Sequence, residues 1–317
     1  MSSETKYRFS VLIPAKGDCP YLDETLRSLL FSSIAPSEIL IVDDGIEPIY
    51  LARITKMFPS LKIKIIKNLG LGLVDALNTG IENASFEYIA RLDGDDMVLP
   101  NRFSEQLEFL NSHPNVVAVG TQVIFIDHSG IEFGKSHYPV GSVSKARNFH
   151  KKCLLAHPSV MYRKSSVLRA GKYRKIFSNN QMDLAEDFDL WLRFSMIGEL
   201  WNLDSYLLKY RQHPNQISRR FSEPQMMAAI YVSSVNSGNI DQCVDNNPFA
   251  KLNSDGMQDR GKVLKTIANN LGKTYEFEFR LYESIYKMKE RNEFRLIKFH
   301  YLILKLLHFQ RGFFSSL

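Results

Sequence analysis

The stretch "LVDALNTGIENASFEYIARLDGDD" (Leu73–Asp96) joins a helical pattern to a buried strand that ends in carboxylates. Apolar residues recur at helical spacing over 73–84, and a short apolar run follows from Phe86. The same alternation occurs earlier in the chain, with strand-like runs at 9–15, 38–43 and 61–68 and helical patterns at 21–33 and 49–58. Short alternating strands and helices predict an α/β fold, with a mostly parallel central sheet covered by helices on both faces.

The second half of the chain continues this pattern less regularly. A helix is predicted over 101–114, a strand over 116–127, a helix within 184–198, and strands followed by a loop over 200–218. From about residue 223 a polar, linker-like sequence leads into a tail of mixed aromatic, aliphatic and basic residues. We therefore expect a main domain over 1–222, with halves at about 1–100 and 101–222, and a helical C-terminal extension over 223–317.

Charge and cysteine content exclude several classes of protein. The 317 residues carry a net charge of +6, but twelve Lys or Arg and only five Asp or Glu lie from Arg260 onward. A basic tail on a near-neutral body does not indicate a nucleic-acid groove. The three cysteines (Cys19, Cys153 and Cys243) are far apart, which argues against a disulfide framework or a zinc site. We find no apolar run of signal-peptide or membrane-span length, and we expect a soluble or peripheral, cytoplasmic protein.

The acid cluster after Leu92 has two explanations from the residues alone. Asp93 and Asp95 alternate across Gly94, so both carboxylates can turn toward one hard divalent cation, and the glycine lets a ligand approach the backbone. The alternative is that these acids are solvated loop residues, one of which caps the following helix. The motif by itself leaves both readings open.

Five motifs in a fixed order carry a family resemblance: "FSVLIPAKGDCPYLDETLRSLL", "EILIVDDG", "GIENASFEYIARLDGDDMVLPNRF", "HPSVMYRKS" and "AEDFDLWLRF". Over roughly residues 7 to 220 the chain resembles the family 2 glycosyltransferases, which implies the GT-A fold. The halves at 1–100 and 101–222 would then bind the nucleotide-sugar and the acceptor. One departure is the segment "NLGLGLVDALN", which has no Arg where many members carry a basic residue.

The resemblance implies that the acid pair holds Mn²⁺ or Mg²⁺ against the diphosphate of a UDP-sugar. Asp95 is the expected metal ligand, Asp93 lies toward the metal's waters, the sugar or the ribose, and Asp96 is structural at a helix cap. His213 would be a further metal ligand if its loop closes over the donor, although a lone loop histidine is often merely exposed. The residues that the resemblance assigns to the nucleotide-sugar are Pro14, Ala15, Lys16, Asp43, Asp44, Asp93, Gly94 and Arg219. Of the two acids Asp43 and Asp44, we assign Asp44 to the uracil ring and expect the unused one to cap the turn.

Asp187 matches the family's catalytic base in "AEDFDLWLRF". Inversion by direct displacement needs a carboxylate that takes the proton from the attacking acceptor hydroxyl. Glu186 would orient the acceptor, while Asp189 projects elsewhere on the helix. The alternative is that the acidic helix start only complements the helix dipole. His157 is expected to be packed or hydrogen-bonded rather than chemical.

The resemblance therefore predicts an inverting, metal-dependent hexosyltransferase or N-acetylhexosaminyltransferase. It would move a single sugar from a UDP-sugar to an oligosaccharide or lipid-linked acceptor of lipopolysaccharide, O-antigen or capsule. The rival from another class is a non-catalytic nucleotide- or glycan-binding protein on the same fold. The basic tail would lie on the inner face of the cytoplasmic membrane, or else pack on the domain or form a dimer contact.

Overall fold

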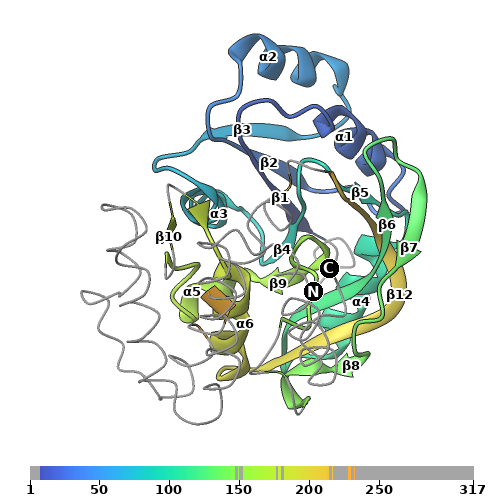
Figure 1. Ribbon diagram of the computed structural model, residues 1–317, viewed down its shortest axis with the longest axis vertical. Coiled ribbons are helices and arrows are strands. Elements are labelled where there is room, and N and C mark those ends of the chain that lie inside the picture. The colour runs from blue at the N-terminus through green and yellow to red at the C-terminus, as the bar shows by residue number, and fades with distance from the viewer. Residues whose placement is uncertain are drawn as a thin grey trace, which may run out of the picture.

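The computed structural model describes residues 8–146, 149, 153–175, 178–179, 182–213, 216, 228–229 and 232 (Figure 1). Most of the predicted extension over 223–317 therefore lies outside the described residues, as does Arg219. Within the described part, the strands form a ten-stranded mixed sheet and a separate two-stranded one. No helix of this part is long and apolar enough to cross a membrane.

The N-terminal half is a regular α/β unit, as predicted. Its strands lie in the order β3-β2-β1-β4 and are all parallel. The elements are β1 (Phe9–Ala15), α1 (Leu22–Leu30), β2 (Glu38–Asp43), α2 (Pro48–Met57), β3 (Ile63–Lys67), α3 (Leu73–Asn83) and β4 (Tyr88–Arg91). Because the strands are parallel, their carboxyl ends meet at one edge of the sheet, where ligands of open α/β folds bind.

The C-terminal half completes the sheet with longer strands. Its elements are β5 (Met97–Val98), α4 (Arg102–Ser112), β6 (Val116–Ile126), β7 (Glu132–Lys135), β8 (Gly141–Ser142), η2 (Val143–Lys145), η4 (His157–Ser159), β9 (Met161–Arg163), α5 (Lys164–Arg169), β10 (Ser178–Asn179), β11 (Met182–Asp183), α6 (Glu186–Ser195) and β12 (Glu199–Arg211). The main path runs β3-β2-β1-β4-β9-β6-β12-β5. β9 is antiparallel to both neighbours, so β6 and β12 point the same way as the first four strands. The predicted mostly parallel sheet is confirmed.

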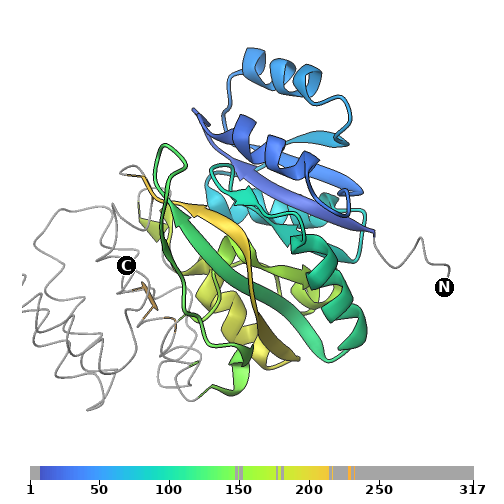
Figure 2. The same cartoon turned by 90° about the vertical axis from the view of Figure 1, so that its right-hand side faces the viewer.

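One detail of the prediction was wrong. The sequence after Leu200 reads as more than one strand, but β12 is a single strand of 13 residues that follows β6 through several register shifts. Figure 2 shows the two strands, green and yellow, running side by side along the sheet. The irregular register explains the broken hydrophobic pattern, because each shift changes which face the next side chain meets.

Two hydrophobic cores lie on opposite faces of the sheet. Alternate residues of β1 supply them: Val11 and Ile13 join one core, and Leu12 joins the other. The first core takes the apolar faces of α1, α2 and α4, and the second those of α3, α5 and α6. The predicted helix layers on both faces are confirmed. Ala228 and Val232, which follow the expected domain boundary, are also buried in the second core.

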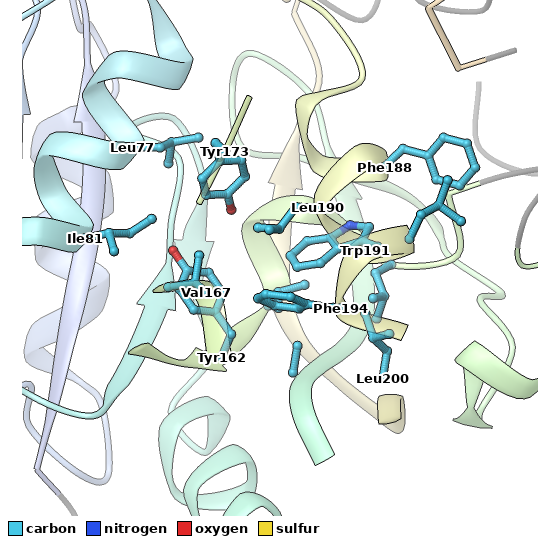
Figure 3. Close-up of a cluster of buried hydrophobic side chains, with 14 of the residues drawn as sticks. Leu77, Ile81, Tyr162, Val167, Tyr173, Phe188, Leu190, Trp191, Phe194 and Leu200 are labelled. Carbon is cyan, nitrogen blue, oxygen red and sulfur yellow. The ribbon is translucent and has the colours of Figure 1, made fainter. Parts of the chain in front are cut away.

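Helix α6 is anchored firmly in that second core. Trp191 and Phe194 are fully buried, and Figure 3 shows them packed beside Tyr162, with Leu77 and Ile81 of α3 beyond it. Because its apolar face is locked in this way, the first turn of α6 has a set position relative to the sheet.

Candidate functional site

The carboxyl ends of β1, β2 and β4 bring three sequence motifs together. Ala15 pairs with Asp43, and the N–H of Asp44 donates to the carbonyl of Ala15 at 2.8 Å. On the other side of β1, the N–H of Leu92 donates to the carbonyl of Leu12 at 3.0 Å. The loops after these three strands therefore start from one edge of the sheet and surround a common site.

The acid cluster after β4 is compact. One carboxylate oxygen from each of Asp93, Asp95 and Asp96 lies within 4.8 Å of the others. Nε2 of His213, which follows β12, lies 3.0 Å from Oδ2 of Asp95. The structure therefore brings together all three residues predicted to bind a metal (Asp93, Asp95 and His213).

The buried Arg91, to which the sequence analysis assigned no role, pairs with Asp93, the first acid of the cluster. NH1 of Arg91 lies 2.5 Å from Oδ2 of Asp93, and the Arg91 side chain is only 3% exposed. Burial raises the pKa of Asp93 to about 6, helped by the charges of Asp95 and Glu186 and opposed by Arg91. The signal was present in "YIARLDG", because a cation inside a strand of otherwise apolar residues needs a partner.

Asp96 is not the helix cap that we expected. It precedes the short strand β5, and α4 begins only at Arg102 with Asn101 at its N-cap. Asp96 is fully buried, and its Oδ1 accepts the main-chain N–H of Arg211 at 2.8 Å. The cap prediction was wrong because a β-pairing with β12, which local sequence does not reveal, intervenes before the helix.

The two acids after β2 have different surroundings. Oδ1 of Asp43 accepts the N–H groups of Gly45 and Ile46 at 2.9 and 2.7 Å, and its Oδ2 pairs with Lys67 at 3.2 Å. Although burial alone would raise it, the pKa of Asp43 is lowered, chiefly by the Ile46 hydrogen bond. Asp43 therefore closes the turn.

Asp44 faces the loop before α3 instead. Its Oδ1 accepts from Nδ2 of Asn68 at 2.9 Å and its Oδ2 from the N–H of Gly72 at 3.3 Å. Nζ of Lys16 lies 3.7 Å from the same Oδ2, although the Lys16 side chain is 62% exposed. Asp44 thus borders the site with hydrogen-bond partners on the β3–α3 loop, and no sequence pattern had pointed to Asn68 as one of them.

Three further residues predicted to bind the nucleotide-sugar lie at the same edge. Pro14 and Ala15 are the last residues of β1. A Cβ added to Gly94 would only make ordinary contacts with Leu22 and Ile13, at 3.6 and 3.8 Å. The packing of the fold therefore does not require glycine at position 94.

Helix α6 begins with the two acids predicted for catalysis. Ala185 precedes them in a left-handed conformation (φ 59°), which is strained for a residue with a side chain. Oε1 of Glu186 lies 3.5 Å from Nδ1 of His157, whose Nε2 lies 2.8 Å from the hydroxyl of Tyr173. His157 is packed and hydrogen-bonded, as expected.

Asp187 presents one oxygen that is held by protein backbone and one that faces a thiol. Its Oδ1 accepts the N–H of Phe188 at 2.7 Å, and Sγ of Cys153 donates to Oδ2 at 3.5 Å. Burial, together with the neighbouring charge of Glu186, raises the pKa of Asp187 above its ordinary value. No pattern in the sequence pointed to Cys153 as a neighbour of this carboxylate.

Asp189, two residues further on, is fully buried and faces away from these groups. It forms ion pairs with Arg174, at 2.5 Å, and with Arg193, at 2.6 Å. The expectation that Asp189 projects elsewhere on the helix is confirmed, and its role is to hold α6 to the segment before it.

The acid cluster and the start of α6 belong to one site. The N–H of Arg91 donates to the carbonyl of Val160 at 2.9 Å, directly after η4, and Nδ1 of His157 in η4 lies 3.5 Å from Oε1 of Glu186. Oδ2 of Asp96 is buried and has no hydrogen-bond partner in the described part of the chain. Carboxylate oxygens with one adjacent imidazole suit Mn²⁺ or Mg²⁺, so the residues fit a hard divalent cation.

Comparisons with known proteins agree with this geometry. A family model described as "Glycosyl transferase family 2" matches residues 10–174. The amylovoran biosynthesis glycosyltransferase AmsE of Erwinia amylovora is 34% identical over 221 residues, which are 67% of this chain and 79% of that protein. An Escherichia coli UDP-Gal:alpha-D-GlcNAc-diphosphoundecaprenol beta-1,3-galactosyltransferase is 29% identical over 199 residues, 61% of this chain and 69% of that protein.

A solved structure supports the fold. S. aureus TarS 1–349 in complex with UDP-GlcNAc superposes with a TM-score of 0.63, at 13% identity. The match covers 98% of this chain and 93% of that one. The expected GT-A architecture is therefore confirmed.

Proposed function

The chain belongs to glycosyl transferase family 2, and on that premise we propose that it is an inverting, metal-dependent transferase for one sugar. The donor would be a UDP-sugar carrying a hexose or N-acetylhexosamine. The acceptor would be a hydroxyl of a bacterial surface glycan of the lipopolysaccharide, O-antigen or capsule type, either as an oligosaccharide or linked to a lipid. Support comes from AmsE, which is named for amylovoran biosynthesis, and from the E. coli relative, whose named substrates are UDP-Gal and a diphosphoundecaprenol-linked sugar.

One observation carries the proposal: the acids of α6 and the acid cluster after β4 share one site. Arg91, which pairs with Asp93, donates its N–H to the carbonyl of Val160 at 2.9 Å, and Nδ1 of the nearby His157 lies 3.5 Å from Oε1 of Glu186, the residue before Asp187. A donor held by the acid cluster would therefore lie within reach of a base on α6. A purely structural acidic helix start would not need this proximity.

Asp95 and His213 would hold the cation, with Asp93 beside them. When bound, Mn²⁺ or Mg²⁺ supplies positive charge that stabilises the departing diphosphate. The ion pair with Arg91 orients the carboxylate of Asp93. In that orientation Asp93 would accept a hydrogen bond from the UDP-sugar.

Asp187 takes the proton in this scheme. The N–H of Phe188 holds Oδ1, so Oδ2, which receives only the weak Sγ–H donor of Cys153, would accept the proton of the acceptor hydroxyl. The acceptor oxygen then bonds to the anomeric carbon as that carbon's bond to the diphosphate oxygen breaks, and UDP leaves. Displacement from the opposite face inverts the anomeric centre. A carboxylate whose pKa is raised by burial is a stronger base than an exposed one.

Asp44 would accept a hydrogen bond from the uracil ring, with Pro14, Ala15, Lys16 and Gly94 lining the rest of the nucleotide site. Asp43 is occupied by its turn and would contribute only indirectly. A lipid-linked acceptor would also bring the protein to the inner face of the cytoplasmic membrane as a peripheral protein.

Calorimetric titration of UDP into the protein, first with Mn²⁺ and then with chelator, tests the donor half of the proposal. We expect binding that requires the metal, followed by turnover of one UDP-sugar in a screen. UDP binding that is indifferent to chelator would contradict the metal dependence. Metal-dependent binding without turnover of any UDP-sugar and acceptor would favour the alternative, a non-catalytic nucleotide- or glycan-binding protein.

A further inference from the structure

Arg211, the last residue of β12, is fully buried yet contacts three separate segments. Its Nε donates to the carbonyl oxygen of Asp95 at 2.8 Å, and its main-chain N–H donates to Oδ1 of Asp96 at the same distance. The guanidinium of Arg211 is therefore hydrogen-bonded to the backbone of Asp95. The main-chain N–H of Arg211 is hydrogen-bonded to the side chain of Asp96.

The remaining donors of Arg211 reach other parts of the site. NH1 donates to the carbonyl oxygens of Asp127 and His128, both at 3.2 Å, in the turn between β6 and β7. NH2 donates to Oε2 of Glu24 on α1 at 2.6 Å, and the guanidinium lies 4.3 Å from the ring centre of Tyr21. Three of these acceptors are main-chain oxygens, so the side chain mainly orients backbone.

His213 follows Arg211 by two residues and returns to the same acid loop. Its Nε2 lies 3.0 Å from Oδ2 of Asp95, and its ring lies 5.6 Å from that of Tyr21. Because His213 lies two residues beyond the end of β12, its position depends on how Arg211 anchors that end of the strand. The position of the Asp95 carboxylate depends on the carbonyl that Arg211 holds.

Burial of a guanidinium costs several kcal/mol before its partners offset the loss of water. A lysine would preserve the charge, but its single ammonium cannot reach the carbonyls of Asp95, Asp127 and His128 in the planar fork that arginine provides. The site therefore requires the fixed directions of the N–H groups of arginine as well as its positive charge.

We propose that Arg211 is a positioning residue that fixes Asp95 and His213 in one cation-binding arrangement. This role rests on the proposed metal-dependent function. Arg211 would influence cation binding without being a ligand of the cation. Groups that orient metal ligands affect affinity by about 10- to 100-fold when they are removed. Arg211 should therefore influence metal affinity and donor binding more than the chemical step.

The test compares Arg211→Lys with wild type and with a matched control, Arg163→Lys. Arg163 also donates to main-chain carbonyls, with Nε 3.0 Å from the oxygen of Val116 and NH2 2.7 Å from that of Leu110, but at the opposite end of β6. Mn²⁺ affinity in the presence of UDP is measured from the free-ion electron paramagnetic resonance signal, below the unfolding temperature of every variant.

We expect Arg211→Lys to weaken Mn²⁺ binding at least about tenfold. Its KM for the UDP-sugar should rise, while kcat at saturating Mn²⁺ should recover to within about threefold of wild type. Arg163→Lys should lower the unfolding temperature but leave Mn²⁺ affinity unchanged. Should Arg211→Lys not fold, Glu24→Gln loosens the same guanidinium from the exposed side, and a weaker loss of Mn²⁺ affinity is expected from it.

Two outcomes would overturn the proposal in distinguishable ways. Wild-type protein that binds UDP without any dependence on Mn²⁺ would remove the proposed metal-dependent function, and the positioning role with it. Wild-type dependence on Mn²⁺ combined with unchanged affinity in Arg211→Lys, or in Glu24→Gln where only that variant folds, would leave the function standing. It would reduce Arg211 to a structural residue.

Discussion

Nε2 of His213 lies 3.0 Å from Oδ2 of Asp95, a contact between residues 118 positions apart. One residue follows the last long strand of the sheet, and the other follows β4. An imidazole beside a carboxylate in a cluster of three acids has the donor atoms of a divalent cation site. Without a cation, the same contact is a hydrogen bond between the imidazole and the carboxylate.

Replacement of His213 by Ala distinguishes these two roles. If His213 supplies a metal ligand, the variant should need about tenfold more Mn²⁺ for half-maximal activity, while its unfolding temperature without metal stays close to wild type. Activity titrated against Mn²⁺ measures the first quantity, and thermal unfolding in chelator measures the second. An exposed histidine of the same chain, His128, provides the control variant. Identical Mn²⁺ requirements for His213→Ala and His128→Ala would remove His213 from the ligand set.

Asp187 and Asp189 form a natural pair of test positions, two residues apart on one helix. Asp187→Asn should lower turnover by about 10²- to 10⁴-fold, because the acceptor hydroxyl loses its base. Its unfolding temperature near neutral pH should stay the same or rise, since an ionised carboxylate whose pKa is raised by burial destabilises the folded state. Turnover and thermal unfolding of the same preparation check both statements.

Asp189→Asn should behave in the opposite way. It weakens two ion pairs of a fully buried carboxylate, with Arg174 and Arg193, so we expect a loss of about 3 kcal/mol in the free energy of unfolding. Folded Asp189→Asn should still bind UDP with Mn²⁺. Full activity in Asp187→Asn would contradict the assignment of the base, whatever Asp189 does.

The pH profile of kcat/KM should fall on the acid side at a higher pH than for an ordinary carboxylate. Burial raises the pKa of Asp187, so the proton-accepting form is lost at a higher pH than it would be for an exposed aspartate. UDP binding with saturating Mn²⁺, measured over the same range, separates this effect from loss of the donor. An acid limb that lies no higher in pH than that of an exposed aspartate would be inconsistent with a base in this environment.

The two acids after β2 should separate binding from stability. Asp44→Asn should weaken UDP binding about tenfold or more, because a carboxylate acceptor for the uracil ring is lost. Asp43→Asn should lower the free energy of unfolding by about 1–2 kcal/mol, because its carboxylate accepts the N–H groups of Gly45 and Ile46. Calorimetry with UDP and denaturant unfolding test the two variants side by side. The reverse pattern would exchange their roles.

The sequence alone predicted a mostly parallel sheet with helices on both faces, and it marked the polar ends of three strands as a candidate site. Runs such as "FSVLIPA" are too short and too β-branched for helices, and the helical patterns between them are too regular for loops. The carboxyl ends of parallel strands lie at one edge of a sheet, so Ala15, Asp44 and Asp93 were expected at the same edge, where the structure places them. These properties are local or follow from the rules of chain connection, and for that reason they could be predicted.

Only the tertiary structure decided how the acids differ from one another. Asp43 and Asp44 are adjacent acids that local sequence does not distinguish. In the structure Asp43 accepts hydrogen bonds from its turn, and Asp44 accepts one from the side chain of Asn68. Asp96 became a partner of Arg211 rather than a helix cap, and Cys153 became a neighbour of Asp187, through contacts between segments distant in the chain. Burial and hydrogen-bond partners fix the role of a carboxylate, and both arise from packing between distant segments, which no local pattern encodes.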